Sequence, residues 1–225
     1  MFEKEIESLV ILYPIITEFL PLLEKSLSEE KYFHSIGVMI TSREIMVSQF
    51  TQNSNAENSY AKNSSDNAQS KLVEKTVIAG LLHDCAKNLS LQDMLQVADT
   101  YGITRNEAGE MSRSLLHAPV GVFVAQRDYK IRDVEILDAI RYHTTGRADM
   151  TLLEKIVYMA DILEPTREIT NDINHDDRIS ILGQAKCQLN KTILSELEKG
   201  INIVLSSGKF LHLNTVSARN FLLAN

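Results

Sequence analysis

The sequence predicts an all-α protein, and two observations carry this prediction. Leu, Ile, Ala and Glu are abundant across the 225 residues, whereas there are nine Gly, four Pro and no Trp. Apolar residues recur at helical spacing, as in the segment 133–142, where Val134, Leu137 and Ile140 fall on one side. We find no convincing strand and no internal repeat. A chain of this length can bury a real core, and we expect a single domain over residues 1–225.

The N-terminal part of the chain, residues 1–28, predicts a helical segment. Its two short helical patterns are split near Pro14 and Pro21, because proline removes a backbone donor and clashes with the preceding turn. A longer helix follows over about residues 30–50, since Ser28 is a suitable N-cap and two glutamates occupy the first turn.

Residues 51–70 form the least core-like stretch of the chain. They include five Asn and five Ser and almost no large apolar side chain, a composition that cannot support a core. We therefore predict a flexible Asn/Ser-rich insertion, followed by a helix over about residues 71–84. A further helix is capped by Ser90 and ended by Gly102, and a short one spans residues 104–109.

Helical signals continue towards the C-terminus. The remaining predicted helices span residues 119–127, 133–142, 152–163, 178–206 and 215–223. Pro119 suits a first helical turn, where its missing N–H is not needed, while Gly146 and Pro165 end the second and third of these helices. Gly200 is the candidate break in the fourth. Residues 178–225 thus form a set of C-terminal helices.

Composition and charge narrow the class of partner. Hydrophobic residues make up 44% and charged residues 24% of the chain, as in an ordinary soluble globular protein. The net charge of −7 and the pI near 5.4 leave no basic field to attract nucleic acid or an anionic membrane.

Cys85 and Cys187 form neither a CxxC motif nor a disulfide framework. The apolar patch 9–23 is too short to span a bilayer and lacks the features of a leader, so we expect a cytoplasmic protein.

In the stretch AGLLHDCAK, residues 79–87, polar side chains meet an apolar run. His83 and Asp84 lie at the end of this run, about 100° apart around a helix, so they cannot share one apolar stripe. Burial of such groups without a partner is costly. A metal ion is one partner that satisfies both, and exposure to solvent at a helix end is the alternative.

Four further polar side chains stand next to apolar runs, each on a different predicted helix or at its end. With His83 and Asp84 they complete a candidate set of metal ligands: His34, His83, Asp84, His117, His143 and Asp161. Each one alone is more often a core or surface residue, but six that can converge from five helices make a stronger case. The set offers imidazole and carboxylate without thiolate, which suits Fe, Mn, Co, Ni or Zn rather than Ca.

The order of these residues resembles a known signature. His34, the pair His83-Asp84 and Asp161 follow the His…His-Asp…Asp order of the HD-domain metal-dependent phosphohydrolases. Four motifs resemble those of the YqeK-type family of symmetrical diadenosine tetraphosphate hydrolases: HDCAK at 83–87, LHAPV at 116–120, HTTG at 143–146 and ADILEPTR at 160–167. The resemblance runs from about residue 31 to 220. It departs from the family at Phe33, where the first motif usually carries a Glu, and at Leu213, where a Pro is often seen.

The resemblance implies an HD-domain helical bundle that holds two metal ions. By analogy, one ion is bound by His34, His83, Asp84 and Asp161, and the other by Asp84, His117 and His143, with Asp84 bridging the two. The ions are expected to be divalent or trivalent transition metals, iron first and manganese as the alternative. Two such ions lower the pKa of a bridging water and neutralise charge on the attacked phosphate.

The resemblance also implies an activity, the hydrolysis of diadenosine tetraphosphate to two ADP by metal-activated water. Asp84 and Lys87 are the expected catalytic residues, because Lys87 follows three positions after Asp84 and so shares its side of the chain. Lys87, Thr144, Thr145 and Arg167 are the expected phosphate contacts, Arg167 as a bidentate clamp on a loop. The expected partner is a small dinucleoside polyphosphate or nucleotide, with neither nucleic acid nor membrane, and the sequence also allows a homodimer.

Two alternatives stay open at this point. One is another HD-type nucleotide phosphohydrolase. A guanosine tetraphosphate hydrolase, however, would show paired acids after its His-Asp, where Cys85, Ala86 and Lys87 stand, and a cyclic-dinucleotide phosphodiesterase would need a Gly-Tyr-Pro motif that the sequence lacks. The other alternative is a non-catalytic, metal-binding module that senses nucleotides. The presence of all six candidate ligands argues against such a degenerate site.

Overall fold

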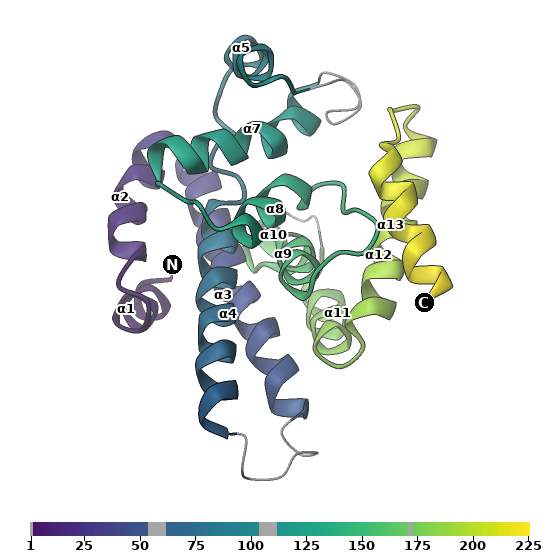
Figure 1. The fold of residues 1–225 in the computed structure, drawn as a ribbon. Helices are drawn as coiled ribbons and strands as arrows, with labels where there is room; N and C mark the ends of the chain where they lie inside the picture. Colours follow the sequence, from purple (N-terminus) through teal and green to yellow (C-terminus); the bar gives the residue numbers. More distant parts are fainter. Residues whose placement is uncertain (1, 54–61, 104–111, 171–172) are drawn as a thin grey trace.

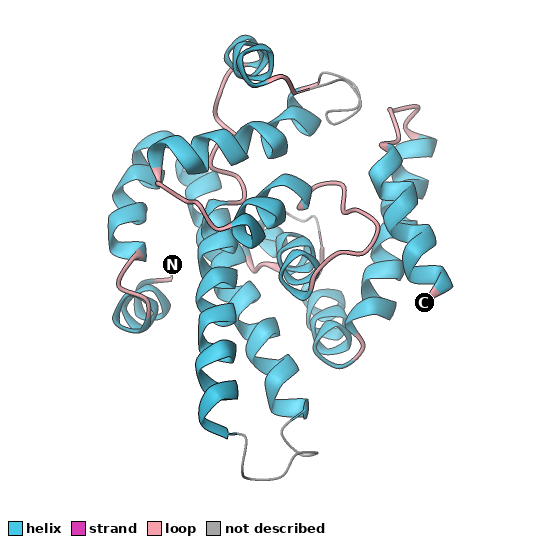
Figure 2. Cartoon of the chain, in the orientation of Figure 1, coloured by secondary structure: helices cyan, strands magenta, loops and turns pink. Residues whose placement is uncertain are grey.

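The computed structural model describes residues 2–53, 62–103, 112–170 and 173–225, and within these ranges every regular element is a helix (Figure 2). The predicted all-α class is therefore confirmed for the described part of the chain. None of the described helices is long and apolar enough to cross a membrane. The helices are α1 (Glu3–Leu12), α2 (Ile16–Ser26), α3 (Glu29–Asn53), α4 (Lys62–Leu82), α5 (Leu91–Tyr101), α7 (Arg113–Asp128), α8 (Val134–Tyr142), α9 (Leu152–Leu163), α10 (Thr166–Ile169), α11 (His175–Cys187), α12 (Leu189–Ser206) and α13 (Leu213–Ala224).

Two long helices, α3 and α4, lie side by side at the centre of the molecule (Figure 1). Helix α9 packs against both of them, and α8 packs against α4, α7 and α9. Helices α1 and α2 lie on one side of this centre, and α11 to α13 on the other (Figure 1). The core is continuous across the central helices, with Ile36, Val77, Ile140 and Ile156 all fully buried. The site described below lies where these central helices meet.

Several helix boundaries follow from capping residues that the sequence displays. Ser90 Oγ accepts a hydrogen bond from the N–H of Asp93 at 3.1 Å, and Gly102 ends α5 in the left-handed region with φ 68°. Thr151 and Glu154 form a capping box at the start of α9, in which each side chain satisfies a backbone N–H of the other. These predicted boundaries are confirmed.

Two prolines lie inside helices, so the boundaries predicted at these positions are wrong. Pro21 is part of α2, and Pro119 is part of α7 rather than its first turn. A proline inside a helix costs about 3 kcal/mol. Burial of large apolar side chains, such as Leu23 and Leu116, contributes roughly 1.5–3 kcal/mol each, so a few buried neighbours on each helix offset that cost.

The predicted insertion is shorter than residues 51–70. Helix α3 continues to Asn53 and α4 begins at Lys62, because a helix extends at little cost once its buried part has formed. The middle of the predicted insertion and the short helix predicted at 104–109 lie outside the described residues.

The long helix predicted over residues 178–206 is two helices, and the break lies at Gln188 rather than at Gly200. Gln188 has φ −139° and ψ 54°, outside the helical region. Ala185 and Leu189 on either side of it are buried, and the bend lets α11 pack against α3 while α12 packs against α13. A glycine inside a helix costs only about 1 kcal/mol relative to alanine, so Gly200 does not end α12.

Candidate metal centre

Six side chains from five parts of the fold converge between the central helices. They are the predicted set: His34 on α3, His83 and Asp84 directly after α4, His117 on α7, His143 at the end of α8 and Asp161 on α9. Donor atoms lie within 4.8 Å of one another in three overlapping sets: His34, His83 and Asp84; His83, His143 and Asp161; and Asp84, His117 and His143. We call His34, His83, Asp84 and Asp161 the first group of donors, and Asp84, His117 and His143 the second group. We call these six residues the His/Asp cluster. The convergence that the sequence predicts is therefore present.

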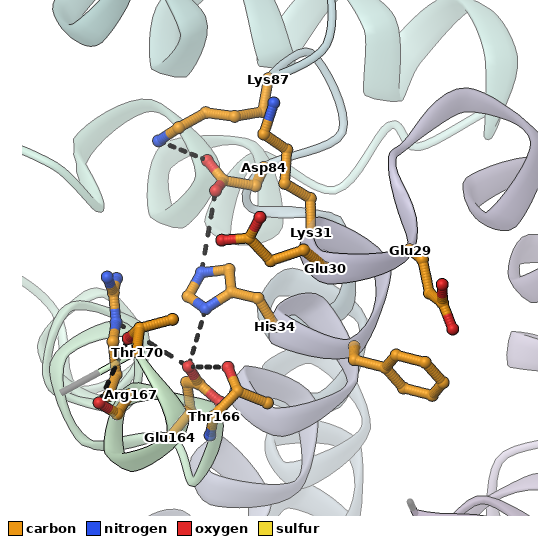
Figure 3. Close-up of a pocket in the computed structure, with 11 residues that line it drawn as sticks. Glu29, Glu30, Lys31, His34, Asp84, Lys87, Glu164, Thr166, Arg167 and Thr170 are labelled. Atoms are coloured by element: carbon orange, nitrogen blue, oxygen red, sulfur yellow. Dashed lines mark hydrogen bonds and ion pairs between the residues drawn. The ribbon is translucent and has the colours of Figure 1, made fainter. Parts of the chain in front are cut away.

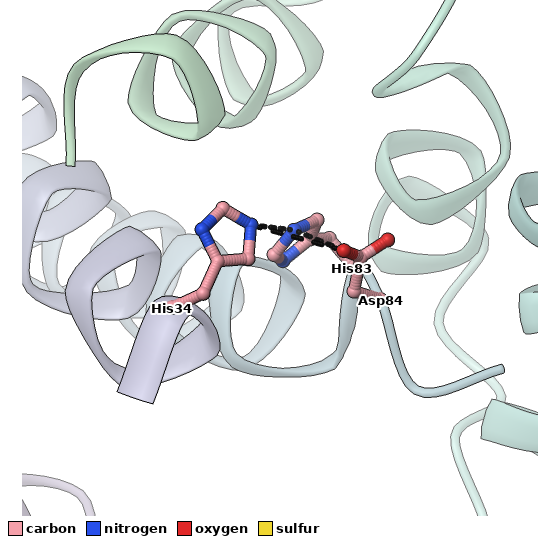
Figure 4. Close-up of side chains that lie close together, drawn as sticks. All are labelled: His34, His83 and Asp84. Atoms are coloured by element: carbon pink, nitrogen blue, oxygen red, sulfur yellow. Dashed lines mark hydrogen bonds and ion pairs between the residues drawn. The ribbon is translucent and has the colours of Figure 1, made fainter. Parts of the chain in front are cut away.

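The first group of donors surrounds Nε2 of His34. This atom lies 3.1 Å from Nε2 of His83 and 3.1 Å from Oδ1 of Asp161. Oδ2 of Asp84 lies 3.7 Å from Nε2 of His34 and 3.5 Å from Nε2 of His83. Figure 4 shows the rings of His34 and His83 directed towards each other and towards Asp84.

The second group of donors faces the other oxygen of Asp84. Oδ1 lies 3.1 Å from Nε2 of His117 and 3.4 Å from Nε2 of His143, and these two nitrogens are 3.0 Å apart. One carboxylate thus turns Oδ2 to the first group and Oδ1 to the second.

Backbone carbonyl groups determine the tautomers of the buried imidazoles. Nδ1 of His83 and Nδ1 of His143 each donate to the carbonyl oxygen three residues earlier, at 2.8 Å. Nδ1 of His117 lies 3.3 Å from the carbonyl oxygen four residues earlier. Because a carbonyl oxygen only accepts, Nδ1 carries the proton and a neutral ring turns the lone pair of Nε2 into the cluster. The lone pairs of His117 and His143 then face each other 3.0 Å apart, and Nζ of Lys87 and Oγ1 of Thr144 each lie 3.0 Å from one of these nitrogens.

The electrostatics of the cluster keep most of its donors ready for a metal. Burial lowers the pKa of His83, and it lowers the pKa of His117 to about 4 despite a hydrogen bond to Asp84. Burial alone would raise the pKa of Asp84, but the imidazoles around it hold that pKa well below its ordinary value. The pKa of Asp161 is also held low, against burial, by a hydrogen bond from His34. Ionised carboxylates beside neutral imidazoles fit divalent transition-metal ions.

His34 differs from the buried imidazoles. Burial lowers its pKa, but hydrogen bonds to Asp161 and Glu164 outweigh burial and raise the pKa to about 9. Metal ligands must be deprotonated, so a cation held by the first group would displace a proton from His34.

Comparison with known proteins assigns the chain that carries this cluster to a family. The family model described as HD domain matches residues 32–166 of the 225-residue chain, a range that contains the whole His/Asp cluster. The chain belongs to the HD-domain family.

Two curated relatives and one solved structure align with this HD-domain chain over nearly its whole length. A Bacillus subtilis protein named symmetrical bis(5'-nucleosyl)-tetraphosphatase is 31% identical over 207 residues, which cover 92% of this chain and 97% of the relative. A protein of the same name from Halalkalibacterium halodurans is 32% identical over 209 residues, covering 91% and 95%. A crystal structure from Clostridium acetobutylicum, described as a predicted HD superfamily hydrolase involved in NAD metabolism, matches with a TM-score of 0.73 and 33% identity, covering 91% of this chain and 95% of that one. The predicted HD-domain bundle and the predicted family are confirmed.

A cavity of about 540 Å³ opens beside the His/Asp cluster of this HD domain (Figure 3). His34 and Asp84 form part of its wall, so the first group of donors is reached from the cavity. Lys87 and Arg167 also border it, with Lys87 extended over Asp84 in Figure 3. The lining residues are Glu29, Glu30, Lys31, Phe33, His34, Asp84, Lys87, Glu164, Thr166, Arg167 and Thr170.

Lys87 and Thr144, two of the predicted phosphate contacts, lie at the second group of donors. Nζ of Lys87 is 3.2 Å from Oδ1 of Asp84, and Oγ1 of Thr144 is 3.0 Å from Nε2 of His143. An ammonium and a hydroxyl therefore lie within hydrogen-bond distance of the cluster, and their contact with a phosphate stays a prediction.

Arg167 and Thr145 are placed differently from the prediction. Arg167 lies in the short helix α10 rather than in a loop, and its Nη2 donates to Oδ1 of Asp161 at 2.6 Å. Its guanidinium thus already contacts the cluster from the cavity wall. The hydroxyl of Thr145 is buried and donates to the carbonyl oxygen of Gly146 at 2.9 Å, so this hydroxyl is engaged with the backbone instead of the cavity.

Glu164, a fully buried carboxylate beside the cluster, is absent from the predicted site residues. Its Oε1 accepts a hydrogen bond from Nδ1 of His34 at 2.9 Å. The available signal was an acidic residue between the apolar helix α9 and Pro165, since a buried carboxylate needs partners. The partner lies 130 positions away in the chain, and no local pattern reveals it.

Proposed function

We propose that this HD-domain hydrolase cleaves diadenosine tetraphosphate symmetrically, giving two ADP, at a centre that holds two metal ions. The observation that carries the proposal is the placement of Asp84, whose Oδ2 faces His34 and His83 and whose Oδ1 faces His117 and His143. Relatives that match 91–92% of the chain are named for this symmetrical cleavage. The net charge of −7 also favours a small anion held by local cations over a polyanion held at the surface.

The proposed ligands divide into two sets that share Asp84. The first ion would be held by His34, His83, Asp84 and Asp161, and the second by Asp84, His117 and His143. We propose iron, with manganese as the alternative, because imidazole and carboxylate donors suit both. When bound, two such ions supply Lewis acidity and a coordinated water of lowered pKa.

Asp84 and Lys87 are the proposed catalytic residues. The ammonium of Lys87 donates to Oδ1 of Asp84 at 3.2 Å, and 34% of the Lys87 side chain is exposed. From this position Lys87 holds the orientation of the Asp84 carboxylate and places a positive charge where the cavity meets the cluster. A fixed donor that contacts developing charge on a phosphate contributes roughly 10²–10³-fold to a rate.

Arg167 and Thr144 are the proposed substrate residues, and Thr145 has a supporting role. The guanidinium fork of Arg167 binds a phosphate through two parallel hydrogen bonds, and its pairing with Asp161 holds it at the cavity wall. The hydroxyl of Thr144 is a further donor beside His143. Thr145 contributes indirectly, because its hydroxyl stabilises the turn that ends at Gly146.

We further propose that the protein acts in the cytoplasm on a small dinucleoside polyphosphate, without nucleic acid or membrane as a partner. Buried Cys85 and exposed Cys187 are both thiols, the state that a reducing compartment maintains. A homodimer is compatible with this proposal.

Product analysis tests the proposed function. The protein is loaded with iron under anaerobic conditions and incubated with diadenosine tetraphosphate, and the nucleotides are separated by anion exchange. Two ADP per substrate is the expected result. A mixture of ATP and AMP would overturn the symmetrical register, and intact substrate in the presence of fully metal-loaded protein would overturn the activity.

A further inference from the structure

Glu164 is a buried charged side chain that lies outside both proposed ligand sets. Its exposed fraction is 0%. Oε1 accepts hydrogen bonds from Nδ1 of His34 at 2.9 Å and from Oγ1 of Thr166 at 2.5 Å, and Oε2 accepts one from the N–H of Thr166 at 2.7 Å (Figure 3). These three donors offset the cost of burying the carboxylate. One of them belongs to a residue of the His/Asp cluster, which points to a role beyond capping α10.

We propose that Glu164 is a positioning residue for the first metal ion. It holds the ring of His34 in the tautomer and orientation that direct Nε2 at the ion, next to Nε2 of His83 and Oδ1 of Asp161. The inference rests on the proposed two-metal function. Outer partners of this kind orient a ligating imidazole and make it a stronger donor.

His34 is the one imidazole of the cluster whose Nδ1 is held by a side chain. The other three imidazoles use carbonyl oxygens three or four residues earlier in the chain, so their anchors move with them. Glu164 instead reaches His34 from the junction of α9 and α10, which also carries Arg167. The contact therefore ties a ligand on α3 to the wall of the substrate cavity.

The backbone of α3 leaves room for this carboxylate at Gly37. Gly37 follows His34 by three residues, and a Cβ added at Gly37 would overlap Oε2 of Glu164. Glycine is unfavourable inside a helix, so a close approach of another group explains its presence here. Any side chain at this position would displace Glu164 from His34 or from Thr166.

The hydrogen bonds of Glu164 require two accepting oxygens. The backbone N–H of Thr166 and the ring N–H of His34 are both donors, and each faces a different oxygen. In Glu164→Gln one oxygen becomes an NH₂ group, which meets a donor in either orientation. The substitution keeps the size of the side chain, yet either His34 or α10 loses its acceptor.

The test measures metal affinity without nucleotide. Metal-free wild-type protein and Glu164→Gln are titrated with Mn²⁺ by calorimetry, and far-ultraviolet circular dichroism confirms that both are folded. Loss of an outer partner typically weakens metal binding by 10–100-fold, and we expect this loss for one of the two binding events. We also expect excess Mn²⁺ to restore the activity of Glu164→Gln, a rescue that a purely structural role would not produce.

Glu154→Gln is the matched control. Glu154 is a buried carboxylate in the first turn of α9, 2% exposed, and it accepts hydrogen bonds from Arg147 at 2.7 and 2.9 Å and from the N–H of Thr151 at 3.3 Å. These partners lie outside the His/Asp cluster. Glu154→Gln removes a buried carboxylate at the end of α9 that is farther from the cluster, so we expect lower thermal stability and an unchanged Mn²⁺ affinity.

Gly37→Ala is a second variant that disturbs the same contact without altering any acid. We expect it to weaken Mn²⁺ binding in the same direction as Glu164→Gln, and it carries the test if Glu164→Gln does not fold. Wild-type Mn²⁺ affinity in the folded variants, or an equal loss in Glu154→Gln, would overturn the positioning role. Tight Mn²⁺ binding by a wild-type protein that leaves diadenosine tetraphosphate intact would instead overturn the proposed function alone.

Discussion

The His/Asp cluster has two halves that the protein holds in different ways. The inner half consists of His83, Asp84, His117 and His143, and the outer half of His34 and Asp161. Side chains of the inner half are 0–5% exposed, whereas those of His34 and Asp161 are 13% and 20% exposed. Carbonyl oxygens anchor the inner imidazoles, while charged side chains, Glu164 and Arg167, hold the outer half.

This difference separates a rigid part of the site from an adaptable part. A carbonyl oxygen inside a helix cannot move without the helix, so the inner half is preorganised. A side-chain anchor can exchange partners, and Arg167 can turn from Asp161 to a phosphate in the cavity that it lines. We infer that the inner half sets the geometry of the centre and that the outer half couples it to the substrate.

The largest effect is expected at Asp84, the residue of the inner half that faces both groups of donors. Asp84→Ala removes the shared carboxylate, so metal occupancy falls from two ions to none and turnover falls to the background rate. Elemental analysis of the purified variant and a product assay check this together. Two bound ions or measurable turnover in Asp84→Ala would show that the two groups do not depend on a bridge.

Metal removal is expected to have the next largest effect, on stability. An ion that binds only the folded state at a thousand times its Kd stabilises that state by about 4 kcal/mol. For a chain of this size, about 4 kcal/mol corresponds to a fall in Tm of roughly 8–16 °C for each ion removed. Thermal unfolding with and without a chelator measures the shift. An unchanged Tm would mean that the inner half is not held together by metal.

Lys87 tests the inner half without removing a ligand. Lys87→Met keeps the length of the side chain and removes its charge, and we expect kcat to fall by roughly 10²–10³-fold while two ions stay bound. Steady-state kinetics and elemental analysis give the two quantities. A variant that loses metal along with activity would place Lys87 in support of the ligands and not in the reaction.

Arg167 tests the outer half. Arg167→Ala removes charge-assisted hydrogen bonds worth about 1.5–3 kcal/mol, so we expect KM to rise by roughly 10–100-fold with metal content unchanged. Arg178→Ala is the control, because Arg178 pairs with Glu168 and the carbonyl oxygen of Leu163, outside the cavity lining. Equal changes of KM in both variants would remove Arg167 from the substrate site.

The smallest effect is expected at Thr145. Thr145→Val removes one buried hydrogen bond to Gly146, so the free energy of unfolding falls by about 1 kcal/mol and KM stays near the wild-type value. Chemical denaturation measures the free energy of unfolding, and steady-state kinetics measures KM. A large rise of KM at unchanged stability would return Thr145 to the direct phosphate contact that the sequence predicts.

The two halves also differ in how far the sequence predicts them. The ligands of both halves are visible as polar residues beside apolar runs, as with His83 and Asp84 after Leu82. Their anchors are not visible. A carbonyl anchor has no side-chain signature, and the contact between Glu164 and His34 joins positions 130 residues apart.

The fold shows the same limit. Local capping signals at Ser90 and Gly102 predict helix ends correctly. The signals at Pro119 and Gly200 fail, because burial against other helices decides whether a helix continues there. Residues that are close in sequence thus predict the helix ends that depend on local capping. Contacts between distant parts of the chain decide the other helix ends.

The most direct test of the account is a crystal structure of the Mn²⁺-loaded protein with diffraction data on both sides of the manganese absorption edge. We expect two anomalous peaks roughly 3.5–4 Å apart, the usual spacing of two-metal sites, with the carboxylate of Asp84 between them. A single peak, or two peaks that Asp84 does not connect, would contradict it.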